Sequence, residues 1–257
     1  MEIKSMSFNL RYDTESDGIN SFTNRFHRVL DVIEKENADI IGFQEVTDSM
    51  RIRLRKELKN YTLIGCGRDA NYHGESMFIA FRTDKFELIS SESVWLSDTP
   101  SIPGSRYKNS DQSGCPRMYT SLLLKHNDIK KPFRFINTHL DHSGENARYL
   151  GAKQLVEAIL KYDEKFILTG DFNATPDSYE IKYMISALKE KGVIDCTKDL
   201  APTFHAFGKI PTDEFLKIDY IFTDGICNKV YAVEDIPENG QYYSDHNAVC
   251  AYIDVDE

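Results

Sequence analysis

Long apolar runs are missing from this sequence, and none approaches the roughly 18 residues that a membrane-spanning helix needs. The chain begins MEIKSMSFNLRY, which alternates like a strand and does not read as a secretory signal. We therefore expect no membrane association, and the cytoplasm is the expected location.

Cysteine is scarce and unsuited to cross-linking. The sequence has five cysteines at wide spacing and no CxxC pair. An odd count without such pairs disfavours a disulfide framework or a thiolate zinc site, and it fits a reducing compartment.

Positive charge is in deficit, because 31 Lys and Arg face 41 Asp and Glu and the net charge is −10. Proteins that bind long nucleic acids through the phosphate groups usually have a basic surface, so strong binding of duplex DNA is not expected. A basic run follows Thr47 in the sequence MRIRLRKELK, and we interpret it as a solvated helix face. The acidity does not exclude catalysis on phosphate groups, because bound metal ions can supply positive charge.

The 257 residues suffice for one large α/β domain, expected over residues 1–257. Apolar periodicity predicts helices at 24–37, from 47, at 145–162 and at 179–191. It predicts strands at 3–10, 40–43, 61–64, 77–82, 86–96, 119–125, 133–138, around 167, 218–223, 230–235 and 248–255.

One unit occurs twice: a strand that ends in Asn, a helix, and a strand that ends in an acid. The spacing from Asn9 to Glu45 is 45 − 9 = 36 positions, and that from Asn137 to Asp171 is 171 − 137 = 34. Two such halves suit two sheets packed face to face with helices outside.

Polar side chains gather where the predicted strands stop. They are Asn9, Glu45, Glu75, His139, Asp171, Asn173, Asp219, Asp245 and His246. Charged groups at such places are costly unless they are paired or metal-bound. Carboxylates with an amide suit Mg²⁺ or Mn²⁺, and zinc is the second choice because thiolates are missing from the set. The absence of a GxSxG elbow disfavours acyl chemistry.

The stretch KFILTGDFNATPDS ends a buried strand with Asp171 and Asn173. Side chains at i and i+2 of an extended chain point the same way, so the two are expected to face one spot. The simpler alternative is turn chemistry, which Asp and Asn both favour.

The fragments FNLRY, FQEV, INTHLDH, TGDFNATP, KIDYIF and YSDHNAV follow one another along the chain. In this order and spacing they resemble the endonuclease/exonuclease/phosphatase family, most closely bacterial relatives of its deadenylase branch. The resemblance covers essentially the whole chain. It implies a four-layer α/β sandwich and Mg²⁺-dependent hydrolysis of phosphate esters.

The resemblance also implies roles for the polar residues. Glu45 resembles the principal metal ligand, with Asn9 nearby on metal or phosphate and Asp245 within reach of a metal. His246 resembles the histidine on the scissile phosphate, with Asp219 orienting it.

Asp171 and Asn173 resemble the pair that handles the attacking water. His139 resembles a second phosphate-contacting histidine, with Glu75 as its partner. Family accounts differ on whether the base is Asp171 or His246. We prefer Asp171, because a histidine held by a carboxylate is more readily cationic.

Some residues have two interpretations. Arg117 could bind substrate phosphate or form a surface ion pair, and His142 could contact substrate or be an ordinary loop residue. Phe204 and Phe207 could stack on a ring, although aromatics are more often core residues. Tyr242 and Tyr243 share that ambiguity.

Three functions compete. Acidity favours a phosphodiesterase or phosphatase acting on small phosphate esters. The deadenylase-like features favour, by analogy, a 3′–5′ exonuclease at RNA or single-stranded DNA ends. A catalytically dead binding module would need lost site residues, and all the key positions of the family are present.

Overall fold

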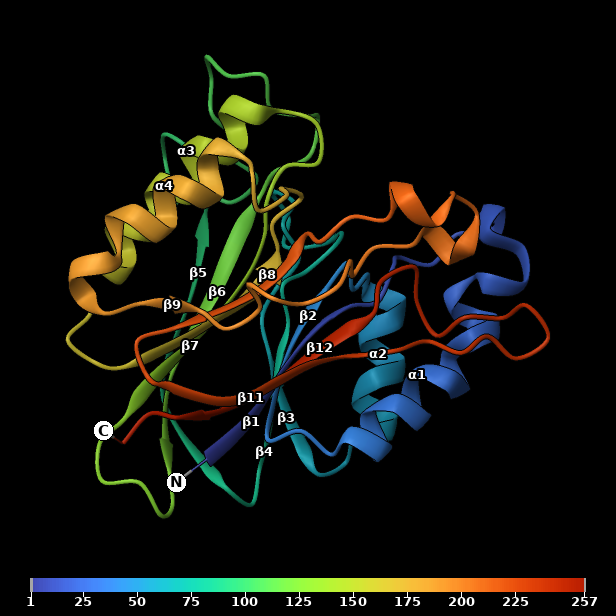
Figure 1. Cartoon of the computed structure of the whole chain (residues 1–257), viewed down its shortest axis with the longest axis horizontal. Coiled ribbons are helices and arrows are strands. Elements are labelled where there is room, and N and C mark those ends of the chain that lie inside the picture. The colour runs from blue at the N-terminus through green and yellow to red at the C-terminus, as the bar shows by residue number, and fades with distance from the viewer. Residues whose placement is uncertain (1, 257) are drawn as a thin grey trace.

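Two six-stranded sheets lie face to face between two layers of helices (Figure 1). The computed structural model describes residues 2–256. Helices α1 and α2 cover the outer face of one sheet, and α3 and α4 cover the outer face of the other (Figure 1). The four-layer α/β sandwich predicted from the sequence is therefore confirmed.

The first sheet has the strand order β11-β12-β1-β2-β4-β3, in which only β1 and β2 are parallel neighbours. Its strands are β1 (Glu2–Asn9), β2 (Ile40–Gln44), β3 (Tyr61–Ile64), β4 (Ile79–Arg82), β11 (Ile226–Val233) and β12 (Ala248–Asp254).

The second sheet has the order β5-β6-β7-β8-β10-β9, in which only β7 and β8 are parallel neighbours. Its strands are β5 (Phe86–Trp95), β6 (Met118–His126), β7 (Phe133–His139), β8 (Phe166–Asp171), β9 (Ile194–Asp195) and β10 (Asp219–Thr223). The two-residue β9 is too short to leave a periodic pattern, and the sequence did not predict it.

The α-helices are α1 (Phe22–Glu36), α2 (Asp48–Glu57), α3 (Glu145–Ile159) and α4 (Tyr179–Ala187). Short 3-10 turns occupy η1 (Glu15–Asn20), η2 (Lys189–Lys191), η3 (Ala206–Gly208) and η4 (Thr212–Glu214). Helix α1 buries Phe26, Val29 and Ile33 on one face, as its periodicity predicts. The helix predicted over 179–191 ends earlier, and its last turn is the separate η2.

The repeated unit seen in the sequence is a repeated unit of structure. Both β1–α1–β2 and β7–α3–β8 join parallel neighbours through a helix, and the two units occupy the same place in the two strand orders. The matching asparagines differ, however. Asn9 ends its strand, whereas Asn137 lies two residues before the end of β7 and donates to the Phe43 carbonyl across the sheet interface at 2.7 Å.

The two sheets approach closely at Gly42 of β2. A Cβ atom there would lie 2.3 Å from Thr169 Oγ1 and 2.7 Å from Asn137 Oδ1, so a larger residue would push the sheets apart. This contact fixes the relative positions of the parallel pairs from which the site is built. Within residues 2–256, no helix is long and apolar enough to cross a membrane.

Candidate active site

Strand topology gathers the predicted polar residues at one edge of both sheets. The parallel pairs end there with Asn9 and Glu45 in one sheet and with His139 and Asp171 in the other. Strand β10 runs antiparallel to β8, so Asp219 at its start lies opposite Asp171. Five separated segments of sequence therefore converge on one place.

Asn9 ties two carboxylates together. Its Nδ2 donates to Glu45 Oε1 at 3.1 Å and to Asp171 Oδ2 at 2.9 Å. Its Oδ1 accepts the Arg11 backbone N–H at 2.9 Å, which fixes the orientation of the amide. In this arrangement Asn9 positions the carboxylates.

Three residues of the site have left-handed backbone conformations: Arg11 (φ 49°), Glu45 (φ 63°) and Asn173 (φ 48°). Such values are uncommon for residues other than glycine, and they cluster at functional sites. The expected extended arrangement of Asp171 and Asn173 is therefore wrong. Asp171 Oδ1 instead accepts the Asn173 N–H at 2.8 Å in a turn, yet both side chains line the same cavity.

His246 is held by a buried carboxylate. Its Nδ1 lies 2.8 Å from Asp219 Oδ2, which also accepts the Thr203 hydroxyl at 2.5 Å. Burial lowers the pKa of His246, but the neighbouring Asp219 charge and hydrogen bond offset this and raise it to about 10. His246 is therefore a cation at neutral pH. The expected pairing with Asp219 is confirmed.

His139 has a different environment. Its Nε2 lies 3.5 Å from Asp171 Oδ2, while its buried Nδ1 has no hydrogen-bond partner among residues 2–256. Burial, together with the charges of Arg117 and Arg68, lowers the pKa of His139 well below its ordinary value, so the imidazole is neutral. The expected partnership with Glu75 is wrong, because Glu75 Oε1 accepts instead from Arg68 at 2.7 Å.

These side chains open into one cavity of about 390 Å³. Its lining includes the predicted Glu45, Glu75, Arg117, His139, His142, Asp171, Asn173, Asp245 and His246. Asn9, predicted to contact metal or phosphate, and Asp219 are not among the lining residues, and hydrogen bonds join them to Asp171 and His246. The sequence reasoning missed Arg11, Tyr12, Arg68 and Cys115. Arg11 and Tyr12 follow Asn9 in the fragment FNLRY, whereas Arg68 lies in a loop without a periodic signal.

The structure shows where the residues with two possible interpretations lie. Arg117 is buried with its Nε 3.5 Å from Asp141 Oδ2, so the surface ion pair is excluded. Its Nη2 lies 2.7 Å from His142 Nδ1. Phe204 lines the cavity, and its ring centroid lies 4.9 Å from that of His246. Phe207 and Tyr243 are buried, and Tyr242 is half-buried.

The donor set fits a hard divalent cation. Glu45, His139 and Asp171 each offer a ligand atom, and these atoms lie within 4.8 Å of one another. Asp245 lines the same cavity, and burial raises the pKa of its carboxyl group. A buried group rich in carboxylate oxygens, with no thiolate among the grouped atoms, suits Mg²⁺ or Mn²⁺ better than zinc.

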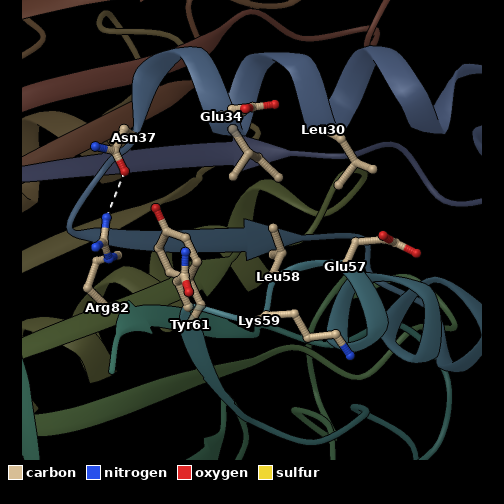
Figure 2. Close-up of a pocket in the computed structure, with 10 residues that line it drawn as sticks. Leu30, Glu34, Asn37, Glu57, Leu58, Lys59, Tyr61 and Arg82 are labelled. Atoms are coloured by element: carbon tan, nitrogen blue, oxygen red, sulfur yellow. Dashed lines mark hydrogen bonds between the residues drawn. The ribbon is translucent and has the colours of Figure 1, made fainter. Parts of the chain in front are cut away.

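A second cavity, of about 360 Å³, lies between the C-terminal ends of α1 and α2 (Figure 2). Arg82 points across it and donates to Asn37 Oδ1 at 2.8 Å (Figure 2). The same guanidinium binds both carboxylate oxygens of Asp84 at 3.0 Å. Because the charge of Arg82 is paired within the chain, this cavity offers no chemistry comparable to that of the cavity around Asp171.

Comparison with known proteins agrees with this geometry. The sequence model of the Endonuclease/Exonuclease/phosphatase family matches residues 6–246. A protein described as an endonuclease/exonuclease/phosphatase from Bacteroides vulgatus is 31% identical, covers 99% of both chains and superposes with a TM-score of 0.91. The mannosyl-6-phosphatase of Bacteroides thetaiotaomicron is 26% identical over 98% of this chain and 99% of its own, with a TM-score of 0.87. The uncharacterized protein L388 of Acanthamoeba polyphaga mimivirus is 29% identical over 89% of each chain.

Proposed function

Because the chain belongs to the Endonuclease/Exonuclease/phosphatase family, whose members are metal-dependent phosphoric ester hydrolases, we propose that it is a Mg²⁺-dependent phosphatase for compact phosphate esters. The observation that carries this proposal is the surroundings of Asp171. Its carboxylate lies within hydrogen-bond or ion-pair distance of Asn9, His139 and His246 and accepts the Asn173 N–H.

Glu45 is the principal residue for holding the cation, with Asp171 and Asp245 beside it. When bound, Mg²⁺ would neutralise the charge that develops on the phosphoryl oxygens. Mn²⁺ has the same ligand preferences and should substitute for it.

Asp171 is the proposed general base. Burial raises its pKa, which brings its proton affinity closer to that of a base working near neutral pH. Asn173 donates through Nδ2 to the Leu140 carbonyl at 3.1 Å. Its Oδ1 therefore remains to accept a hydrogen bond from the attacking water, which would place that water beside Asp171.

The two histidines have different tasks in this proposal. Cationic His246 donates a charge-assisted hydrogen bond to a phosphate oxygen and stabilises the negative charge of the transition state. Neutral His139 donates or accepts a hydrogen bond without adding charge. The carboxylate that fixes each imidazole differs, since Asp219 holds His246 and Asp171 faces His139.

The relative that acts on a mannosyl 6-phosphate group supports a small phosphate ester as substrate. The net charge of −10 supports the same class. A panel of p-nitrophenyl phosphate, bis-p-nitrophenyl phosphate, mannose 6-phosphate and oligo(A) tests it. We expect the monoesters to be hydrolysed fastest. Preferential shortening of oligo(A) from its 3′ end would replace the phosphatase with the exonuclease.

We expect duplex DNA to bind weakly and with little dependence on salt. Each phosphate contact contributes about −0.9 to the log–log slope of affinity against salt, and a chain with a net charge of −10 should make only a few such contacts. The slope between about 50 and 200 mM salt should therefore lie between about −1 and −3. Fluorescence anisotropy with a labelled duplex measures it. Submicromolar affinity with a steep slope would refute the small-substrate proposal.

Asp219→Asn should lower turnover while leaving Mg²⁺ affinity unchanged. The substitution removes the charge that keeps His246 protonated, so the pKa of His246 should fall towards its ordinary value. The imidazole pKa is read by NMR titration, and Mg²⁺ affinity from the dependence of rate on Mg²⁺. A large rise in the apparent Mg²⁺ dissociation constant would instead make Asp219 a metal ligand.

A further inference from the structure

We propose that Arg68 and Arg117 form a second anion subsite in the catalytic cavity, and that the natural substrate is a phosphate ester carrying a second anionic group, a phosphate or a carboxylate. Both arginines line the cavity. The inference rests on the proposed function, because it assumes that a phosphate ester occupies the catalytic end.

Each arginine has an unused nitrogen. Arg68 is 6% exposed and Arg117 is 4% exposed, and the buried Nη1 atom of each has no hydrogen-bond partner among residues 2–256. A buried guanidinium N–H without an acceptor is costly, because it has lost its hydrogen bonds to water. A ligand oxygen that accepts from these atoms would remove that cost.

The charge of Arg117 is only weakly compensated. Its Nε lies 3.5 Å from Asp141 Oδ2, and that oxygen already accepts the Ser113 hydroxyl at 2.5 Å. The other oxygen, Asp141 Oδ1, accepts three backbone N–H groups. Among residues 2–256, the other side-chain hydrogen bond of Arg117 is with the imidazole of His142. Asp141 therefore has little capacity left for this guanidinium.

Arg68 brings a second cation to the same wall. Its Nη2 donates to Glu75 Oε1 at 2.7 Å. Burial raises the pKa of Glu75, and the positive charges of both arginines act to lower it. Burial and the charge of Arg68 both lower the pKa of Arg117, as expected for two neighbouring cations. Guanidinium forks match the oxygens of phosphates and carboxylates, so an anion is the ligand that this pair would take.

The ion-pair partners of the two arginines differ from those of the catalytic group. The ion pairs of Asp171 are with His139 and His246, whereas those of Arg68 and Arg117 are with Glu75 and Asp141. In the part of the chain that the structure describes, no ion pair joins either arginine to Asp171 or Glu45. One cavity of about 390 Å³ contains both groups, so the two anionic ends must belong to a compact molecule.

Matched substrate pairs test the subsite. Fructose 1,6-bisphosphate against fructose 6-phosphate adds a phosphate, and 6-phosphogluconate against sorbitol 6-phosphate adds a carboxylate. Wild-type kcat/KM should be about 10- to 100-fold higher for the doubly anionic member of at least one pair, the range for charge-assisted hydrogen bonds. The pair that shows the preference identifies the second group.

Arg117→Gln should abolish this preference, and Arg117→Lys, which keeps the charge but loses the fork, should reduce it. Arg68→Gln alone leaves Glu75 unpaired, so the double variant Arg68→Gln/Glu75→Gln is the safer test. Lys125→Gln, at an exposed position of β6, changes net charge as Arg117→Gln does and should keep the preference. Circular dichroism confirms that each variant is folded.

The outcomes separate the two proposals. Hydrolysis of the singly anionic esters without any preference for the second anion overturns the subsite and leaves the phosphatase standing. Equal losses on both members of each pair, in folded variants, also overturn it, because the arginines would then serve the scissile phosphate or the fold. Failure to hydrolyse any phosphate ester refutes the proposed function and the subsite that depends on it.

Discussion

Glu45→Gln should lower the rate of phosphate-ester hydrolysis by about 10²-fold or more, the scale for removal of one electrostatic catalytic element. The amide keeps the shape of the side chain but removes the charge that holds the cation. The change also weakens the acceptor for the Tyr12 N–H, which lies 3.0 Å from Glu45 Oε2. Rates measured against increasing Mg²⁺ should give a raised apparent dissociation constant for the metal.

Glu57→Gln is the matched control, because Glu57 is exposed on α2 and outside the cavity. It should behave as wild type. If Glu45→Gln retained full activity at low Mg²⁺, Glu45 would not be the principal ligand, and Asp171 with Asp245 would have to take that place.

Asp171→Asn should reduce kcat by about 10²- to 10⁴-fold, the range for loss of a general base. The carboxylate is the point at which Asn9, Asn173 and the two histidines meet, so its loss removes both the base and the charge that these groups share. KM should change less than kcat, because His246 still binds the scissile phosphate. Steady-state kinetics on p-nitrophenyl phosphate separates the two constants.

Asp177→Asn serves as the control in the same loop, since its carboxylate is 98% exposed. A second arm distinguishes the two candidate bases. If His246→Gln removed the acidic limb of the pH–rate profile, where a general base becomes protonated, while Asp171→Asn left kcat within about tenfold of wild type, His246 would be the base, and Asp171 would be a metal ligand only.

The sequence predicted which polar residues the structure brings together, because these residues lie at strand ends in ordered motifs. Strands alternate and stop abruptly, so Asn9, Glu45, His139 and Asp171 could be assigned to the sheet edge without coordinates. The pairing of Asp219 with His246 was predicted from the family resemblance of KIDYIF and YSDHNAV, and the structure contains this contact.

The features of the site that the sequence did not predict depend on turns and loops. Asn173 was expected to extend the strand, but an Asx-type hydrogen bond from its N–H to Asp171 gives it a left-handed backbone. Glu75, the expected partner of His139, forms its ion pair with Arg68 instead. Arg68 lies in a loop, and no periodic pattern in the sequence predicts the position of that loop. Such contacts between distant loops are set by packing, which local sequence does not encode.

The most direct test of the central claim is the rate of p-nitrophenyl phosphate hydrolysis by EDTA-treated protein as Mg²⁺ is added back. The account predicts no hydrolysis in EDTA and a saturable return of the wild-type rate with Mg²⁺, with Glu45→Gln shifted to higher concentrations. Full activity in EDTA, in protein that contains no residual metal by elemental analysis, would contradict it.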